Sequence, residues 1–204
     1  MKSIRFLILA LIAAGLAAGP ALAQQPQTKR VRGTVEGLEG NALTVKTREG
    51  PVVKITLADN AAVSAVVALT VADIKPNSYV GIASIKGANG MQRAIEVLVF
   101  PEAARGSGEG HYPWDLQPDS MMTNATVGTV MAHPGAKMLE LTYKDGKQTI
   151  TVPDGVPIVT FGPGDRTLLV KGAGVFIGGA QVGADGSLTA ARVIAGKGGI
   201  NPPM

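Results

Sequence analysis

The chain of 204 residues carries the same pattern twice. Residues 31–35 match residues 126–130, so that Gly33 and Gly128 lie 95 residues apart. The register then continues, with single-residue slips, through further matched positions: Leu43 with Leu139, Ile55 with Ile150, Asp59 with Asp154, Val63 with Ile158 and Val97 with Val193. Self-similarity at a fixed spacing indicates two copies of one structural unit, each of about 70 residues.

Apolar and polar residues alternate along each copy, which is typical of strands with one buried face. In the first copy this alternation predicts five strands, at residues 31–35, 43–45, 53–57, 80–82 and 95–99. Residues 70–75 fit one short helical turn between the third and fourth strands, and residues 165–170 occupy the same place in the second copy. We therefore expect an all-β protein of two tandem, small, five-stranded OB-like barrels, or small sandwiches, each with one short helical turn.

Several motifs resemble an uncharacterised family of exported bacterial domains. They are Val31-x-Gly33-Thr34-Val35, Leu43-x-Val45, Val71-x-Asp73-Ile74-Lys75-Pro76 before Tyr79-Val80, and the Asn89-Gly90 turn. That family is described as small OB-like β-domains of unknown function, often in tandem. The resemblance implies an OB-like fold and export, and it implies no catalytic residues.

The first 23 residues are typical of a secretory signal peptide. Lys2 and Arg5 precede an apolar stretch, and residues 21–23 read Ala-Leu-Ala, which matches the small-x-small cleavage pattern. We expect cleavage here, no membrane span afterwards, and a periplasmic or secreted protein of a Gram-negative envelope. Loss of two of the 19 Lys and Arg residues leaves 17 of them against 15 Asp and Glu. This small surplus does not indicate nucleic-acid binding.

The repeat divides the rest of the chain. We expect OB-like domains at residues 28–100 and 125–196, a connector at residues 101–124 that is rich in aromatic residues and glycine, and a flexible tail at residues 197–204. The connector holds the single Trp of the chain, although aromatic residues make up only 4% of the whole chain.

Disordered spacers avoid large aromatic residues, so this connector needs an explanation. In one interpretation Trp114 and Tyr112 fill a groove between the two barrels. In the other, Tyr112, Trp114, Asp115 and Arg105 form a binding surface for an envelope protein or a small ligand. The sequence leaves both interpretations open.

Histidine and methionine residues in the same region suggest a third hypothesis. Imidazole and thioether groups suit copper, so His111, Met121 and Met122 are a candidate copper or nickel site. Successive residues of a strand point to opposite faces, however, and methionine often fills gaps in a core.

Enzyme chemistry has little support in the composition. The chain has no cysteine, which excludes thiolate nucleophiles, cysteine metal sites and disulfides, and it has only two histidines. It also lacks the Gly-x-Ser-x-Gly motif of serine hydrolases. We expect an exported, non-enzymatic binding protein without a cofactor, with metal binding as the alternative.

Overall fold

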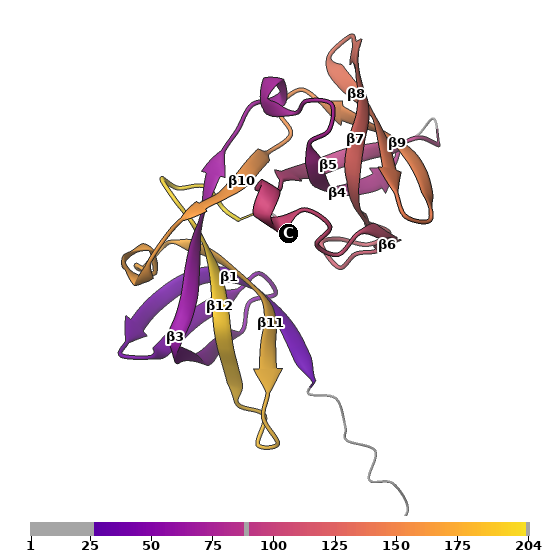
Figure 1. Ribbon diagram of the computed structural model, residues 1–204. Coiled ribbons are helices and arrows are strands. Elements are labelled where there is room, and N and C mark those ends of the chain that lie inside the picture. Colours follow the sequence, from indigo (N-terminus) through magenta and orange to yellow (C-terminus); the bar gives the residue numbers. More distant parts are fainter. Residues whose placement is uncertain (1–26, 88–89, 203–204) are drawn as a thin grey trace, which may run out of the picture.

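The computed structural model describes residues 27–87 and 90–202, and this part of the chain consists mainly of β-strands (Figure 1). Its helical elements are single 3-10 turns: η1 (Val71–Asp73), η2 (Glu102–Ala104) and η3 (Arg166–Leu168). The strands are β1 (Thr28–Glu39), β2 (Ala42–Thr47), β3 (Val52–Ala68), β4 (Tyr79–Lys86), β5 (Gln92–Val99), β6 (Gly110–Pro113), β7 (Met121–His133), β8 (Ala136–Tyr143), β9 (Gly146–Pro153), β10 (Ile158–Pro163), β11 (Gly174–Val182) and β12 (Leu188–Gly196). The predicted all-β class is confirmed.

A first barrel is closed by five strands in the order β1, β2, β3, β12, β11 and back to β1. Neighbouring strands are antiparallel except β3 and β12, which run parallel from the Leu188–Ile55 pair to the Gly196–Val66 pair. Each strand of the ring has a neighbour on both sides, so this unit is a barrel and not a sandwich.

A second barrel has the equivalent order β7, β8, β9, β5, β4 and back to β7. Here β5 and β9 are the parallel neighbours, through the pairs Gln92–Ile150 and Arg93–Thr151. The pair Gln92–Ile150 occupies the same repeat positions as Leu188–Ile55 in the first barrel. The prediction of two small OB-like barrels is therefore confirmed.

The two barrels do not coincide with the two repeats. The first barrel takes β1 to β3 from one repeat and β11 and β12 from the other, and the second barrel takes the remaining strands. The prediction that residues 28–100 and 125–196 each form a barrel is therefore wrong. The second barrel is instead the continuous segment 79–153, inserted between the two parts of the first. Because both repeats have the same apolar pattern, either set of strands can complete a barrel, and the pattern alone does not tell which one does.

The antiparallel strand pair of β3 and β10 joins the barrels, and we call it the bridge (Figure 1). The end of β3 pairs with β12 on one side as far as Val66 and with β10 on the other, and at the centre of the β3–β10 pair Val66 lies opposite Phe161. On its other side β10 pairs in parallel with β5 of the second barrel. These two residues are 95 positions apart, so they occupy the same place in the two repeats. A residue that faces its own equivalent marks a two-fold axis, and the bridge therefore relates the repeats by an approximate two-fold rotation.

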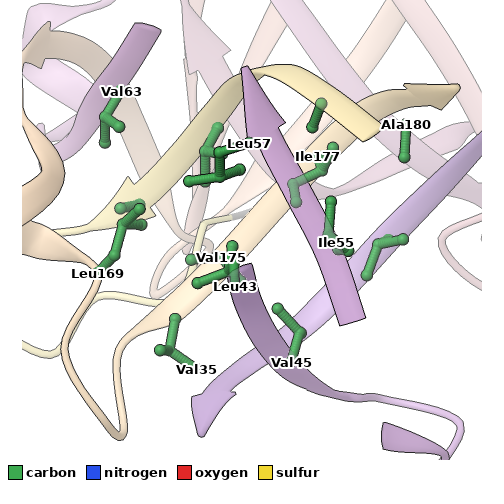
Figure 2. Packing of buried hydrophobic residues seen from close by; sticks show 14 of the residues in the cluster. Val35, Leu43, Val45, Ile55, Leu57, Val63, Leu169, Val175, Ile177 and Ala180 are labelled. Carbon is green, nitrogen blue, oxygen red and sulfur yellow. The ribbon is translucent and has the colours of Figure 1, made fainter. Parts of the chain in front are cut away.

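Each barrel has its own apolar core, to which both repeats contribute. In the first barrel, Leu43 and Ile55 meet Val175 and Ile177 (Figure 2). The core of the second barrel likewise combines residues of both repeats, among them Ile82, Val97, Leu139 and Ile150. Burial of each such side chain stabilises the fold by about 1.5–3 kcal/mol, so neither core is complete without strands from both repeats.

A third apolar cluster lies between the barrels, and we call it the inter-barrel cluster. Its buried members are Val66, Leu98, Val159 and Phe176, and five partly buried residues pack against them: Phe100, Trp114, Phe161, Ile194 and Ile200.

The predicted helical turns are present between the third and fourth strands of each repeat, as η1 and η3. In η1 the carboxylate of Asp73 accepts hydrogen bonds of 2.8 Å from the Thr70 amide and hydroxyl. Ile74 follows η1 and is buried in the core of the second barrel, and Leu169 follows η3 and is buried in the first. The residue after each turn therefore places an apolar side chain in the core of one barrel.

Two predictions concern the ends of the chain. The predicted tail is not free over its first part, because Ile200 packs on the inter-barrel cluster. Residues 203–204 lie outside the described residues, as does the predicted signal peptide at residues 1–23.

Candidate functional site at the barrel junction

The predicted connector does not link the barrels. Residues 101–124 run from the end of β5 into β7, and both strands belong to the second barrel. The segment is also structured, because β6 pairs antiparallel with β7 from Gly110–Asn124 to Pro113–Met121. The barrels are linked instead by residues 69–78 and 154–173.

Asn124 of β7 holds the connector in place. Its Nδ2 atom donates to the carbonyl oxygens of Ser107 at 3.2 Å and Gly108 at 3.0 Å, and to the Tyr112 hydroxyl at 3.1 Å. Its Oδ1 atom lies over Gly81 on β4, where a Cβ would come within 2.7 Å of it. A glycine is therefore required opposite Asn124 for the side chain to reach the connector.

Trp114 lies where the connector meets the first barrel. Tyr112 packs on it edge to face, with ring centroids 6.2 Å apart. The guanidinium of Arg30, on β1 of the first barrel, lies 4.3 Å from the centroid of the indole. Trp114 also packs on the inter-barrel cluster and is half-buried, so the connector spans the junction between the barrels.

Asp115 adds an ionic contact across the same junction. Its carboxylate accepts hydrogen bonds from Arg32 at 2.8 Å and from Arg30 at 3.2 Å. Burial by itself would raise the pKa of Asp115, but the hydrogen bond from Arg32 and the charges of both arginines hold it below its ordinary value. Arg32 is 9% exposed, whereas Arg30 and Asp115 are 43% and 47% exposed. We call Arg30, Arg32, Tyr112, Trp114 and Asp115 the Trp114 cluster.

Arg105 has other partners. Its guanidinium pairs with Glu102, with an Nη2–Oε2 distance of 2.7 Å, and donates to the carbonyl oxygen of Asn77 at 2.8 Å. It lies 5.9 Å from the ring centroid of Tyr79. Three of the four predicted binding residues, Tyr112, Trp114 and Asp115, are therefore in contact as a group, and Arg105 takes part in a different set of contacts.

The predicted metal ligands lie on two faces of the β6–β7 pair. His111 is opposite Thr123 and Pro113 is opposite Met121, which puts His111 and Met121 on one face. Met122 faces the other way and is 5% exposed. The Nδ1 atom of His111 is 2.8 Å from the Thr123 hydroxyl, and burial lowers the pKa of the imidazole. The three predicted ligands are therefore not brought together.

Four further carboxyl groups with shifted pKa values lie outside the Trp114 cluster. Hydrogen bonds from neighbouring residues lower the pKa of four further carboxyl groups, Asp73, Glu102, Asp165 and Asp185. These four carboxyl groups are therefore ionised at neutral pH. Within residues 27–87 and 90–202, no three His, Asp or Glu side chains are placed to hold a metal ion.

Sequence reasoning missed two residues of the cluster, Arg30 and Arg32. Both lie on β1, two residues apart, and their guanidinium groups approach Trp114 from the opposite barrel. The Arg-x-Arg spacing was visible as two cations on one face of a strand. Nothing in the local pattern indicated that residues more than 80 positions away would meet this face.

Comparison of the chain with protein-family models, with curated proteins and with solved structures finds no match. The resemblance to exported OB-like domains therefore stays a prediction. In the part of the chain that the structure describes, no helix has the length and apolar character needed to cross a membrane.

Proposed function

We propose that this protein is an exported, non-enzymatic binding protein of the bacterial envelope, and that the Trp114 cluster is its contact surface. The observation that carries the proposal is the half-buried Trp114, held at the barrel junction between Tyr112 and the partly exposed Arg30 and Asp115. Trp, Tyr and Arg are the residues that most often dominate the energy of protein interfaces.

The rigidity of the connector supports this role. Beyond Trp114 the chain turns back at Ser120. The Ser120 hydroxyl donates to the carbonyl oxygen of Trp114 at 2.9 Å and to that of Gln117 at 2.8 Å. The Trp114 amide donates to the Ser120 carbonyl at 2.8 Å. Asn124 fixes the other end of the connector. A surface fixed in this way loses little conformational entropy when a partner binds.

The charges of the cluster suit a polypeptide partner. Arg30 and Asp115 are each exposed to nearly half, so they offer hydrogen-bond donors and acceptors at the rim of the aromatic pair. An aromatic centre with a polar rim is the usual composition of a protein interface. The expected signal peptide is consistent with a partner in the envelope.

Site-specific photo-crosslinking in cells that export the protein tests the proposal. A photoreactive amino acid replaces Gln117, which is exposed beside the cluster, and in a control replaces Val170, which is 59% exposed in the link between β10 and β11. We expect a discrete adduct from position 117 only, and its loss when Trp114→Ala is added to a chain that still folds.

Equal adducts from both positions, or an adduct that persists in the folded Trp114→Ala variant, would contradict the proposal. An adduct with a molecule much smaller than a protein would assign the surface to a small ligand instead of a polypeptide.

A further inference from the structure

One stretch of the repeat has two conformations in this chain. In the first repeat, Asp59 and Asn60 lie inside β3, which continues from the first barrel into the bridge. In the second repeat, the equivalent residues Asp154 and Gly155 form a turn between β9 and β10. Gly155 has a φ of +80° there, a backbone conformation that other residues rarely adopt. The same place in the repeat is therefore compatible with an extended strand and with a turn.

The segment beyond this turn completes the first barrel. β11 covers the free edge of β1 from the Thr28–Gln181 pair to the Thr34–Gly174 pair, and β12 covers the edge of β3. These strands also supply part of the core of that barrel. Without residues 158–202, the sheet of β1, β2 and β3 would have two edges with no neighbouring strand. It would also keep only about half of the buried residues of its core.

We propose that residues 154–157 are a hinge, through which the C-terminal segment 158–202 completes the first barrel of a second copy of this chain. When residues 154–157 become extended, as Asp59 and Asn60 are within β3, the segment that follows β9 is directed away from its own molecule. The segment of the second copy has the same sequence, so it pairs with β1 and β3 in the same register. The result is a reciprocally exchanged dimer with no new interface except at the hinge.

Protein concentration during folding controls this exchange. Within one molecule the segment is tethered to the first barrel through the second, which corresponds to an effective concentration in the millimolar range. Refolding at about 5 µM should therefore give monomers almost entirely, and refolding at about 500 µM should give a substantial exchanged fraction.

Introduced cysteines report the exchange, because the natural chain has none. Thr28→Cys and Gln181→Cys are made in separate full-length chains, and the two chains are mixed, unfolded in denaturant, refolded together and oxidised. These positions face each other across β1 and β11, so a disulfide between the two chains forms only in an exchanged dimer. The matched control is Thr142→Cys mixed with Lys147→Cys, which face each other across the β8–β9 hairpin and stay within one chain in either form.

A hinge variant adds a second measurement. Gly155→Val strains the turn and favours a strand, so it should raise the cross-linked fraction at a given concentration by about tenfold or more. The control is Gly186→Val in the β11–β12 turn, where φ is +79°. That variant strains monomer and dimer alike and should leave the fraction unchanged.

Three results support exchange: a cross-chain disulfide that depends on concentration, exceeds the hairpin control and rises in Gly155→Val. A Thr28–Gln181 cross-link that never exceeds the control in the natural hinge sequence, even at about 500 µM, overturns the proposal. An equal rise in Gly155→Val and Gly186→Val also overturns it, because a general loss of stability would then explain both. If Gly155→Val does not fold, the concentration series of the natural hinge sequence decides.

Discussion

Val66 on β3 lies directly opposite Phe161 on β10, and the two residues occupy the same position in the two sequence repeats. The antiparallel pair around them is the bridge between the barrels, and the inter-barrel cluster packs about it. Because the repeats exchange strands on either side of this point, each barrel depends on both halves of the sequence.

A cut in the connector should leave the molecule assembled. A recognition sequence for a site-specific protease is inserted between Gly106 and Ser107, which are both exposed. After cleavage, the N-terminal fragment holds β1 to β5 and the C-terminal fragment holds β6 to β12, so both barrels contain strands of both fragments. We expect the fragments to elute together in native size-exclusion chromatography and to separate in denaturant. Separation without denaturant would mean that each repeat folds alone.

Removal of the Phe161 ring should destabilise the whole molecule. The ring packs on the inter-barrel cluster, with its centroid 6.2 Å from that of Phe100. Phe161→Ala should lower the free energy of unfolding in urea by about 2–3 kcal/mol, since the ring is partly buried. The control Val170→Ala removes methyl groups from a side chain that is 59% exposed and should change the free energy by less than about 0.5 kcal/mol. Similar losses in both variants would argue against a structural role for the bridge.

Two substitutions separate the ring of Trp114 from its N–H group. The Nε1 atom is buried and has no hydrogen-bond acceptor among the described residues. Trp114→Phe keeps an aromatic ring and removes a donor that makes no bond, so it should lower the free energy of unfolding by less than about 1 kcal/mol. Trp114→Ala should lower it by about 2 kcal/mol, because a half-buried ring is lost. A loss in Trp114→Phe that equals the loss in Trp114→Ala would contradict this expectation, because the N–H group and not the ring would then account for the stability.

The ion pairs of Asp115 should make stability depend on acid pH. The pKa of Asp115 is lowered in the folded state, so its contribution is complete above the unfolded-state pKa of about 3.9 and is lost as the pH falls through the lower folded value. Asp115→Asn should reduce the free energy of unfolding at pH 7, by less than about 1 kcal/mol for a group this exposed. The difference from the natural sequence should shrink as the pH is lowered below about 4.

Urea unfolding at a series of pH values measures this effect. Asp119→Asn, in the same exposed turn, is the control and should not reproduce the loss at pH 7. A difference between Asp115→Asn and the natural sequence that is the same at every pH would mean that the ionic contacts with Arg30 and Arg32 do not contribute.

Calorimetric titration with Cu(I), Cu(II) and Ni(II) tests the metal hypothesis. His111 and Met121 share one face of the β6–β7 pair and Met122 lies on the other, so we expect no saturable binding tighter than about micromolar. Tighter binding that His111→Ala abolishes would show that the connector rearranges around a metal.

Local patterns predicted much of this fold. Alternation at spacing two placed β1, β2, the first part of β3, β4 and β5, and the segments around Asp73 and Asp165 gave the short turns that η1 and η3 confirm. The connector was recognised by its aromatic residues, and Trp114, Tyr112 and Asp115 do lie together. Each of these features depends on residues close in sequence, for which spacing and side-chain chemistry are sufficient information.

The features that were predicted wrongly all depend on contacts between distant residues. The sequence predicts two barrels or sandwiches in tandem, an aromatic- and glycine-rich connector between them and a flexible tail. In the structure the barrels exchange strands, the connector belongs to the second barrel, and Ile200 packs between the barrels. Arg30 and Arg32 joined the Trp114 cluster only because β1 lies against the connector.

The sequence by itself determined that the chain forms two similar small β-units, because the repeated alternation fixes which residues must be buried, and it left open whether each unit is a barrel or a sandwich. Only the tertiary structure decided which strands share a barrel. Both repeats present nearly the same apolar faces and edges, so the pattern alone does not tell whether a repeat pairs with its counterpart or with itself. The choice depends on the path of the chain after the third strand, where Asp59 and Asn60 stay within β3 and Asp154 and Gly155 form a turn.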